Sequence, residues 1–256
     1  MIHWRSSPPP PRSMLMQARS QSSGRLPAGA RPVAHRRRSL RLVAGVMLLG
    51  VFLSGCANLK KLDDPGRFGP FFTPQNHAGV KVLPASLHRV LVLPVYGGSV
   101  ADVEATLPLD EVLIGGLQKK ARFEVVALSR EDCQRRFNHP EIASTAVLPD
   151  GFLEELGKAY GADAVLFVDL TIYHPYGSLA IGFRAKLATV HEVRLIWSFD
   201  DVFSLSDPAV VNSVHRYCQS SGAAPSSVDM TSGVLQSPRR FAAYVADAMF
   251  ATLPPR

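Results

Sequence analysis

From residue 88 onward, apolar positions follow two different periods. Short runs of branched apolar residues alternate with segments in which apolar residues recur every three or four positions. The runs predict buried strands, and the three-to-four spacing predicts helices that bury one face. The predicted strands cover 88–95, 123–128 and 164–174, and the predicted helices cover 108–121, 129–137, 151–160, 207–217 and 238–253.

Polar residues mark the ends of these helices. Pro108 stands in the first turn of the first helix, where a missing N–H costs little. Ser129 and Asp132 have the spacing of a capping box, and Asp150 and Ser237 precede two further helices as N-caps. Gly161 stands where a helix commonly ends in a left-handed residue.

Two strands with strict alternation follow the turn at 175–178. Phe183, Ala185, Leu187 and Thr189 share one face of the first strand, and Val193, Leu195, Trp197 and Phe199 share one face of the second. Pairing 185 with 197 and 187 with 195 places all eight on one side, with a three-residue loop at 190–192. A slip by one residue would place Arg184 opposite Phe199, so the pattern selects against it.

The resulting order is β-α-β-α-α-β-β-β-α-α, with residues 219–236 expected as a loop. A βαβ start followed by a three-strand meander predicts an α/β fold, a single mixed-sheet domain over 88–256 with helices packed on the sheet.

The N-terminal region has a different pattern. Residues 1–35 are rich in proline, serine and arginine and are expected to be disordered. Because they contain Met14 and Met16, a true start downstream of Met1 stays open. A basic cluster at 36–41 then precedes an uncharged run at 42–53. This run is short for a membrane span and typical of a secretory signal, so 36–55 is interpreted as a signal peptide. General secretion and the twin-arginine route both stay open.

The signal ends in Leu53-Ser54-Gly55-Cys56, which resembles the lipobox of bacterial lipoproteins. The resemblance implies that a signal peptidase recognises Leu53, Ser54 and Gly55 and cuts before Cys56, whose thiol carries lipid. The alternative is an ordinary membrane anchor with an incidental cysteine. Ala57 is not the aspartate that retains many such proteins in the inner membrane. The expected location is therefore the periplasmic face of the outer membrane, with the inner membrane as the alternative.

Removal of the leader changes the charge. The whole chain has a net charge of +7, but nine of its 28 basic residues and none of its 21 acidic residues precede Cys56. The mature chain therefore has 19 basic and 21 acidic residues, a net charge of about −2. Such a surface does not attract polyanions over long range, which argues against a nucleic-acid partner.

Residues 56–87 are rich in proline and glycine and are interpreted as the lipidated cysteine followed by a tether. Phe68, Phe71 and Phe72 are unusual in a free linker, and we expect them to dock on the domain. Cys133 and Cys218 form a candidate disulfide in an oxidising compartment, although their pairing depends on geometry that the sequence does not contain.

The sequence contains no strong catalytic or metal-binding motif, such as H-E-x-x-H, G-x-S-x-G or paired C-x-x-C. We therefore predict no catalytic residues, metal or cofactor. Asp200 and Asp201 are adjacent in a strand and should point to opposite faces. His174 and His191 are interpreted as turn residues and Trp197 as core. Asp169 interrupts an apolar strand and needs a partner, for which Arg184 and Lys186 are the candidates.

The motifs VLPV, FEVV, GADAVLFVDLTIY and the hairpin containing IW resemble one group of envelope proteins over residues 88–205. The group comprises the periplasmic α/β domains of curli-secretion-channel lipoproteins, penicillin-binding-protein activator lipoproteins and the Tol β-propeller protein. It has no shared catalytic residues, so the resemblance implies a non-catalytic module that binds an envelope protein or assists assembly. The alternative is a lipid-anchored cell-wall hydrolase with an unrecognised site.

Overall fold

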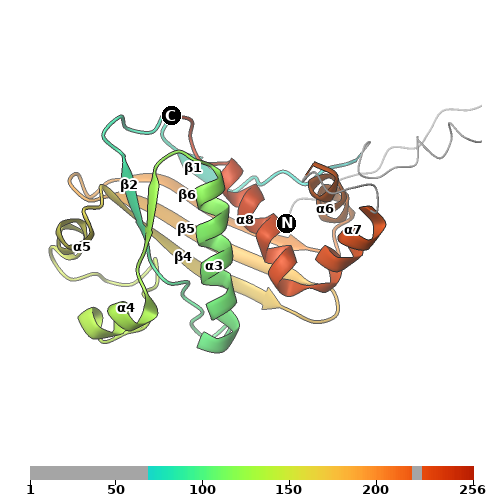
Figure 1. Cartoon of the computed structure of the whole chain (residues 1–256), viewed down its shortest axis with the longest axis horizontal. Helices are drawn as coiled ribbons and strands as arrows, with labels where there is room; N and C mark the ends of the chain where they lie inside the picture. The colour runs from blue at the N-terminus through green and yellow to red at the C-terminus, as the bar shows by residue number, and fades with distance from the viewer. Residues whose placement is uncertain (1–68, 221–226) are drawn as a thin grey trace, which may run out of the picture. The chain divides into compact units, whose positions relative to one another are not determined.

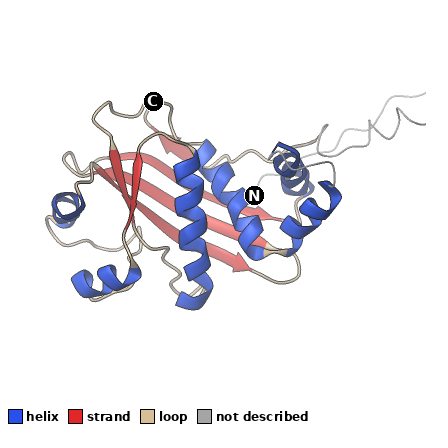
Figure 2. Ribbon diagram, viewed as in Figure 1, coloured by secondary structure: helices blue, strands red, loops and turns tan. Residues whose placement is uncertain are grey.

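The computed structural model describes residues 69–220 and 227–256, apart from the side chains of 227–230. These residues form a six-stranded mixed sheet in the order β1-β6-β5-β4-β2-β3, with helices packed on it (Figures 1 and 2). The α/β fold and the single mixed sheet expected from the sequence are confirmed. The leader, the lipobox and Phe68 lie outside the described residues.

One half of the sheet is parallel, because helices connect its strands. β2 lies between β3 and β4 and pairs in parallel with both. The branched apolar residues of β2 and β4 are buried from both sides, as the unbroken apolar runs predict. The elements of this half are β2 (Arg89–Val92), α3 (Val103–Lys119), β3 (Glu124–Ala127), α4 (Arg130–Phe137), α5 (Phe152–Tyr160) and β4 (Ala164–His174).

The other half is an antiparallel meander of β4, β5 (Ala180–Thr189) and β6 (Leu195–Ser204). Its register differs from the prediction by two residues, because Ala185 lies opposite Phe199 and Leu187 opposite Trp197. The turn is longer than predicted: the N–H of Thr189 donates to the carbonyl of Arg194. A slip by two keeps Trp197 and Phe199 on their predicted face, so alternation alone does not exclude it. The predicted face is wrong for Val193 and Leu195, which are exposed, because the register shifts beside Leu195 and Ile196 takes the place in the core.

The prediction of a tether extending to residue 87 is wrong for its second part. His77–Gly79 form β1, an edge strand that pairs antiparallel with β6. Leu83 and Leu87 are buried in the core, and the Phe72 ring packs on Phe203 with centroids 4.8 Å apart. Docking of the described phenylalanines is therefore confirmed. The short strand H-A-G escapes a pattern-based prediction because it has no apolar alternation.

The C-terminal part contains α6 (Pro208–Ser220), α7 (Ser227–Gln236) and α8 (Pro238–Ala251). The predicted loop at 219–236 is wrong, because α7 occupies half of it. The helix predicted to begin at Pro108 begins at Val103 instead. Three predicted helix ends are confirmed: Ser129 and Ser237 accept hydrogen bonds from backbone N–H groups of their helices, and Gly161 is left-handed with φ of 62°.

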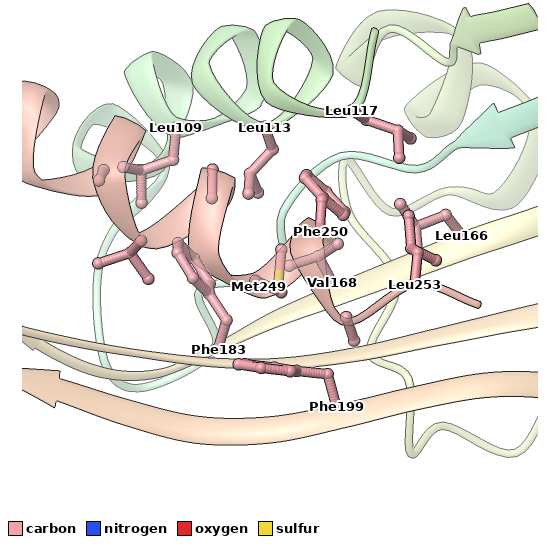
Figure 3. Packing of buried hydrophobic residues seen from close by; sticks show 14 of the residues in the cluster. Leu109, Leu113, Leu117, Leu166, Val168, Phe183, Phe199, Met249, Phe250 and Leu253 are labelled. Atoms are coloured by element: carbon pink, nitrogen blue, oxygen red, sulfur yellow. The ribbon is translucent and has the colours of Figure 1, made fainter. Parts of the chain in front are cut away.

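Two hydrophobic clusters lie on opposite faces of the sheet. Even-numbered residues of β2 and β4, such as Val92 and Leu166, join the larger cluster, whereas the odd-numbered Leu91 and Val165 join the smaller one. Figure 3 shows leucines of α3 directed toward Phe250 of α8, with Phe183 on the sheet below. α4 and α5 contribute the helical residues of the smaller cluster.

Candidate binding cleft at the hairpin end of the sheet

A cleft of about 900 Å³ lies between the start of α5 and the turn that joins β5 to β6. This size is typical of ligand-binding clefts in proteins. Its apolar lining comes from both sides, chiefly from Leu148, Phe152, Leu153, Val190 and Val193. Because these residues come from segments about 40 positions apart, no local sequence pattern could have indicated the cleft.

Glycines hold α5 close to the turn. Gly151, with φ of 74°, is the N-cap of the helix, so the predicted cap at Asp150 is wrong by one residue. A Cβ on Gly157 would lie 2.6 Å from the Val190 side chain, which means that only glycine permits this approach. The position of the helix against the turn is therefore set by the absence of a side chain.

Asp163 joins the strand ends beneath the cleft. Its carboxylate accepts hydrogen bonds from the N–H groups of His88 (2.8 Å) and Arg89 (2.9 Å), at the start of β2. Its carbonyl accepts the N–H of Val190 at 2.8 Å. Three segments thus meet at one residue that lines the cleft.

Val193 has an unusual backbone at the mouth of the cleft. Its φ is 49°, a left-handed conformation that a β-branched residue rarely adopts, and 71% of the residue is exposed. Such a conformation costs about 1–2 kcal/mol. An exposed apolar residue held under strain suggests a functional role, because neither burial nor backbone preference accounts for it.

Carboxylates dominate the charge of the cleft. Asp150, Glu154 and Asp163 line it together with one lysine, Lys158, and with His191. The hydrogen bond from Lys158 and the lysine's charge lower the pKa of Glu154, whose carboxylate lies 2.7 Å from the Lys158 ammonium. No hydroxyl or thiol side chain is among the described lining residues. The lining can bind an apolar group beside a cation.

A second polar cluster occupies the opposite end of β2. Arg130 on α4 donates to Asp110 (2.7 Å) and Glu141 (2.6 Å) and to the carbonyl of Val95. Burial alone would lower the pKa of Arg130, but the hydrogen bonds and charges of these two carboxylates outweigh it and raise the pKa. Glu141 also accepts the N–H of Gly97. Every charged group here has a partner, so the cluster stabilises the fold.

The partner predicted for Asp169 is wrong. Its buried carboxylate accepts hydrogen bonds from the N–H (2.7 Å) and hydroxyl (2.6 Å) of Ser144. Lys186 donates to the carbonyl of Ser144, and Arg184 pairs instead with Asp200 at 2.8 Å. The loop that carries Ser144 lies over β4 and β5 at this point. The order of residues along the strands does not indicate this contact.

The candidate disulfide between Cys133 and Cys218 is not formed. Both thiols are free and buried, Cys133 in the smaller cluster and Cys218 in the larger, so the sheet separates them. Burial raises the pKa of Cys133 to about 11 and also raises the pKa of Cys218. Both thiols are therefore poor nucleophiles.

Other singled-out residues behave largely as expected. Trp197 is a core residue whose indole N–H donates to Thr252 at 3.2 Å. Asp200 faces Arg184, whereas the Asp201 carboxylate accepts the N–H of Gln75. His174 is exposed at the end of β4, and His191 is exposed in the turn but also lines the cleft.

Residues 69–220 and 227–256 contain neither a cluster of metal ligands nor a helix able to span a membrane. No group of three or more histidine, cysteine, aspartate or glutamate side chains in these ranges is placed to hold a metal ion. In the same ranges, no helix has the length and apolar character needed to cross a bilayer.

No protein-family model and no curated protein matches the sequence. Solved structures similar to it include the PelC dodecamer of Paraburkholderia phytofirmans, with 12% identity over 70% of this chain and 96% of that one (TM-score 0.40). Lipoprotein GNA1162 of Neisseria meningitidis has 19% identity over 45% and 79% (TM-score 0.33). TolB of Acinetobacter baumannii has 11% identity over 55% and 29% (TM-score 0.29).

A lipoprotein and TolB thus stand among the similar structures, both at low identity. Likenesses with TM-scores this low say nothing about what the present chain binds or does.

Proposed function

We propose that this protein is a lipid-anchored module of the cell envelope that binds a partner protein without catalysing a reaction. Cys56 carries the lipid at the outer membrane, and the cleft at the hairpin end receives the partner. The anchor is supported by the basic cluster, the short apolar run and the sequence L-S-G-C.

The observation that carries the binding role is the strained, exposed Val193 at the mouth of a 900 Å³ cleft. Glycine or asparagine at position 193 would avoid the strain, because both tolerate a left-handed backbone. The apolar side chain is therefore interpreted as a contact for the partner.

Charge complementarity defines the partner's chemistry. Three carboxylates, one lysine and His191 line a cleft whose other side chains are apolar, and the Asp163 carboxylate already accepts backbone N–H groups. Asp150 has no ion-pair partner among the described residues. The occupant is a segment of a partner protein in which a large apolar side chain stands next to a lysine or arginine.

The alternative, a cell-wall hydrolase, would need a carboxylic acid whose pKa is raised so that it can protonate a leaving group. The pKa of Glu154 is instead lowered by Lys158. The described lining also supplies no serine, threonine or cysteine nucleophile. The cleft therefore favours binding over hydrolysis.

The test uses the mature chain with two pools of short synthetic peptides. In one pool a large apolar residue is followed by lysine, and in the other it is followed by glutamate. We expect the immobilised protein to retain the lysine pool, and Asp150→Asn and Val193→Gly to reduce that retention several-fold. Val82→Gly is the control, because Val82 is also exposed but lies outside the cleft.

Preference for the glutamate pool, or equal retention by Val193→Gly and wild type, would contradict the proposal. Release of soluble fragments from purified peptidoglycan by the wild type, lost in Glu154→Gln, would establish the hydrolase instead.

A further inference from the structure

The first described residues of the chain are fixed against α6. The N–H of Phe72 donates to the carbonyl of Ala209 (3.1 Å) and to the hydroxyl of Ser213 (2.8 Å). Asn212 donates to the carbonyl of Pro70 at 3.0 Å, and the Arg216 guanidinium lies 4.8 Å from the centre of the Phe71 ring. Gly69 is therefore held beside α6.

The α6 end and the cleft lie at opposite ends of the sheet. α6 follows the end of β6, whereas the cleft lies at the start of β4 and the β5–β6 turn (Figure 1). β4 has 11 residues, so about 35 Å separates its two ends. The two ends are thus a full strand length apart.

The chain between Cys56 and Gly69 is short in comparison. It covers 13 residue steps and spans at most about 45 Å, whatever its conformation. If the cleft end faced the membrane, the chain would use about three quarters of its maximum reach to pass along the sheet. If the α6 end faced the membrane, the chain would use none of its reach in this way.

The two ends also differ in surface chemistry. Tyr176, which is 88% exposed, stands in the turn after β4, and the hydroxyl of Ser178 in this turn shares a 2.8 Å hydrogen bond with that of Ser206 just before α6. An exposed tyrosine is typical of the lipid–water interface. Arg216 on α6 is cationic and exposed, which suits phosphate headgroups. The charged residues that line the cleft, by contrast, are mostly carboxylates.

We propose that the α6 end, with Tyr176 and Arg216, rests on the phospholipid surface that holds Cys56. The cleft then faces away from the membrane, about 35 Å further out. This orientation rests on the proposed function in one respect, because it takes Cys56 to carry lipid.

The test compares dyes at the two ends. Tyr176→Cys and Val193→Cys are each labelled with a fluorescent maleimide in the lipidated protein, since Cys133 and Cys218 are buried and unreactive. The labelled proteins are reconstituted in phosphatidylglycerol–phosphatidylethanolamine vesicles that contain a headgroup spin label. We expect several-fold stronger quenching at 176 than at 193, and weaker quenching at 176 when Arg216→Glu is added.

Equal quenching at both positions, or stronger quenching at 193, would overturn the orientation while leaving the anchor intact, provided that the protein floats with the vesicles. Failure to float would instead overturn the lipid anchor and the orientation with it. Flotation therefore separates the two failures.

Discussion

Cys133 and Cys218 lie on opposite faces of the same β-sheet, each buried in its own hydrophobic cluster. We expect both to stay free in the folded protein, even under oxidising conditions. A maleimide reagent should label neither thiol in native protein and both in denaturant. A peptide that contains both cysteines, found in a non-reducing digest of native protein, would contradict this.

The Cys133 thiol also makes stability depend on pH. Its pKa is about 11 in the folded protein, raised by burial from an ordinary value of 9.0. Between these values the folded state binds more protons than the unfolded state, so stability falls as the pH rises from 9 to 11, by about 2 kcal/mol. Denaturant unfolding of Cys133→Ala, compared with wild type over this range, should show a shallower decline. Parallel curves would contradict the assignment.

Gly157 and Gly115 should respond oppositely to alanine. At Gly157 the new Cβ would lie 2.6 Å from Val190, so we expect Gly157→Ala to destabilise the protein by about 1–3 kcal/mol. At Gly115, inside α3, nothing lies within 4 Å, and alanine should stabilise by about 0.5–1 kcal/mol through helix propensity. Thermal unfolding of both variants measures the difference. A stabilised Gly157→Ala would mean that α5 is not held as described.

Arg130 should contribute far more to the stability of the folded protein than Arg135, which lies on the same helix, α4. Arg130→Met leaves the part-buried Asp110 and Glu141 without their cation, which should cost about 1–3 kcal/mol. Arg135 pairs with Asp132 at the surface, so Arg135→Met should change stability by less than about 1 kcal/mol. Urea unfolding at neutral pH compares the two. Similar losses in both variants would contradict the structural role of the part-buried cluster of Arg130, Asp110 and Glu141.

Phe72 should stabilise the domain even though it lies before the predicted domain boundary. Phe72→Ala removes the contact with Phe203 and should cost about 1–3 kcal/mol. The control, Val82→Ala, alters an exposed side chain and should stay within about 0.5 kcal/mol of wild type. For the same reason, deletion of residues 63–80, which include β1, should destabilise the fold.

Cys56→Ala should release the protein from the membrane fraction. Two or three acyl chains, at about 0.8 kcal/mol per buried methylene, bind almost permanently, and the variant has none. Cys133→Ala is the control and should remain membrane-bound. Mass spectrometry of the wild-type N-terminal peptide should show the added lipid. Unchanged fractionation of Cys56→Ala, together with an unmodified peptide, would exclude the anchor.

The sequence by itself determined the features of the domain that depend on neighbours in the chain. Unbroken apolar runs indicated β2 and β4, and Ser129, Gly161 and Ser237 marked helix ends, because these structures depend on hydrogen bonds and burial within a few residues. The alternation also indicated the core face of β5 and of β6 from Trp197 onward, because that period is a property of the strand. It failed at Val193 and Leu195, where the register shift beside the turn breaks the period.

The tertiary structure alone decided the features that join distant segments. Pairing Ala185 with Phe199 instead of Trp197 leaves both side chains on the same face of the sheet, so alternation does not select this register. The longer β5–β6 turn accompanies it, and this turn is held by the hydrogen bond from the N–H of Val190 to the carbonyl of Asp163. β1 exists because β6 offers it a backbone edge, and Asp169 binds Ser144 because a distant loop crosses the sheet. The cleft likewise forms where α5 meets the β5–β6 turn. A space between two packed segments depends on how they pack, so neither segment shows it as a pattern in its own sequence.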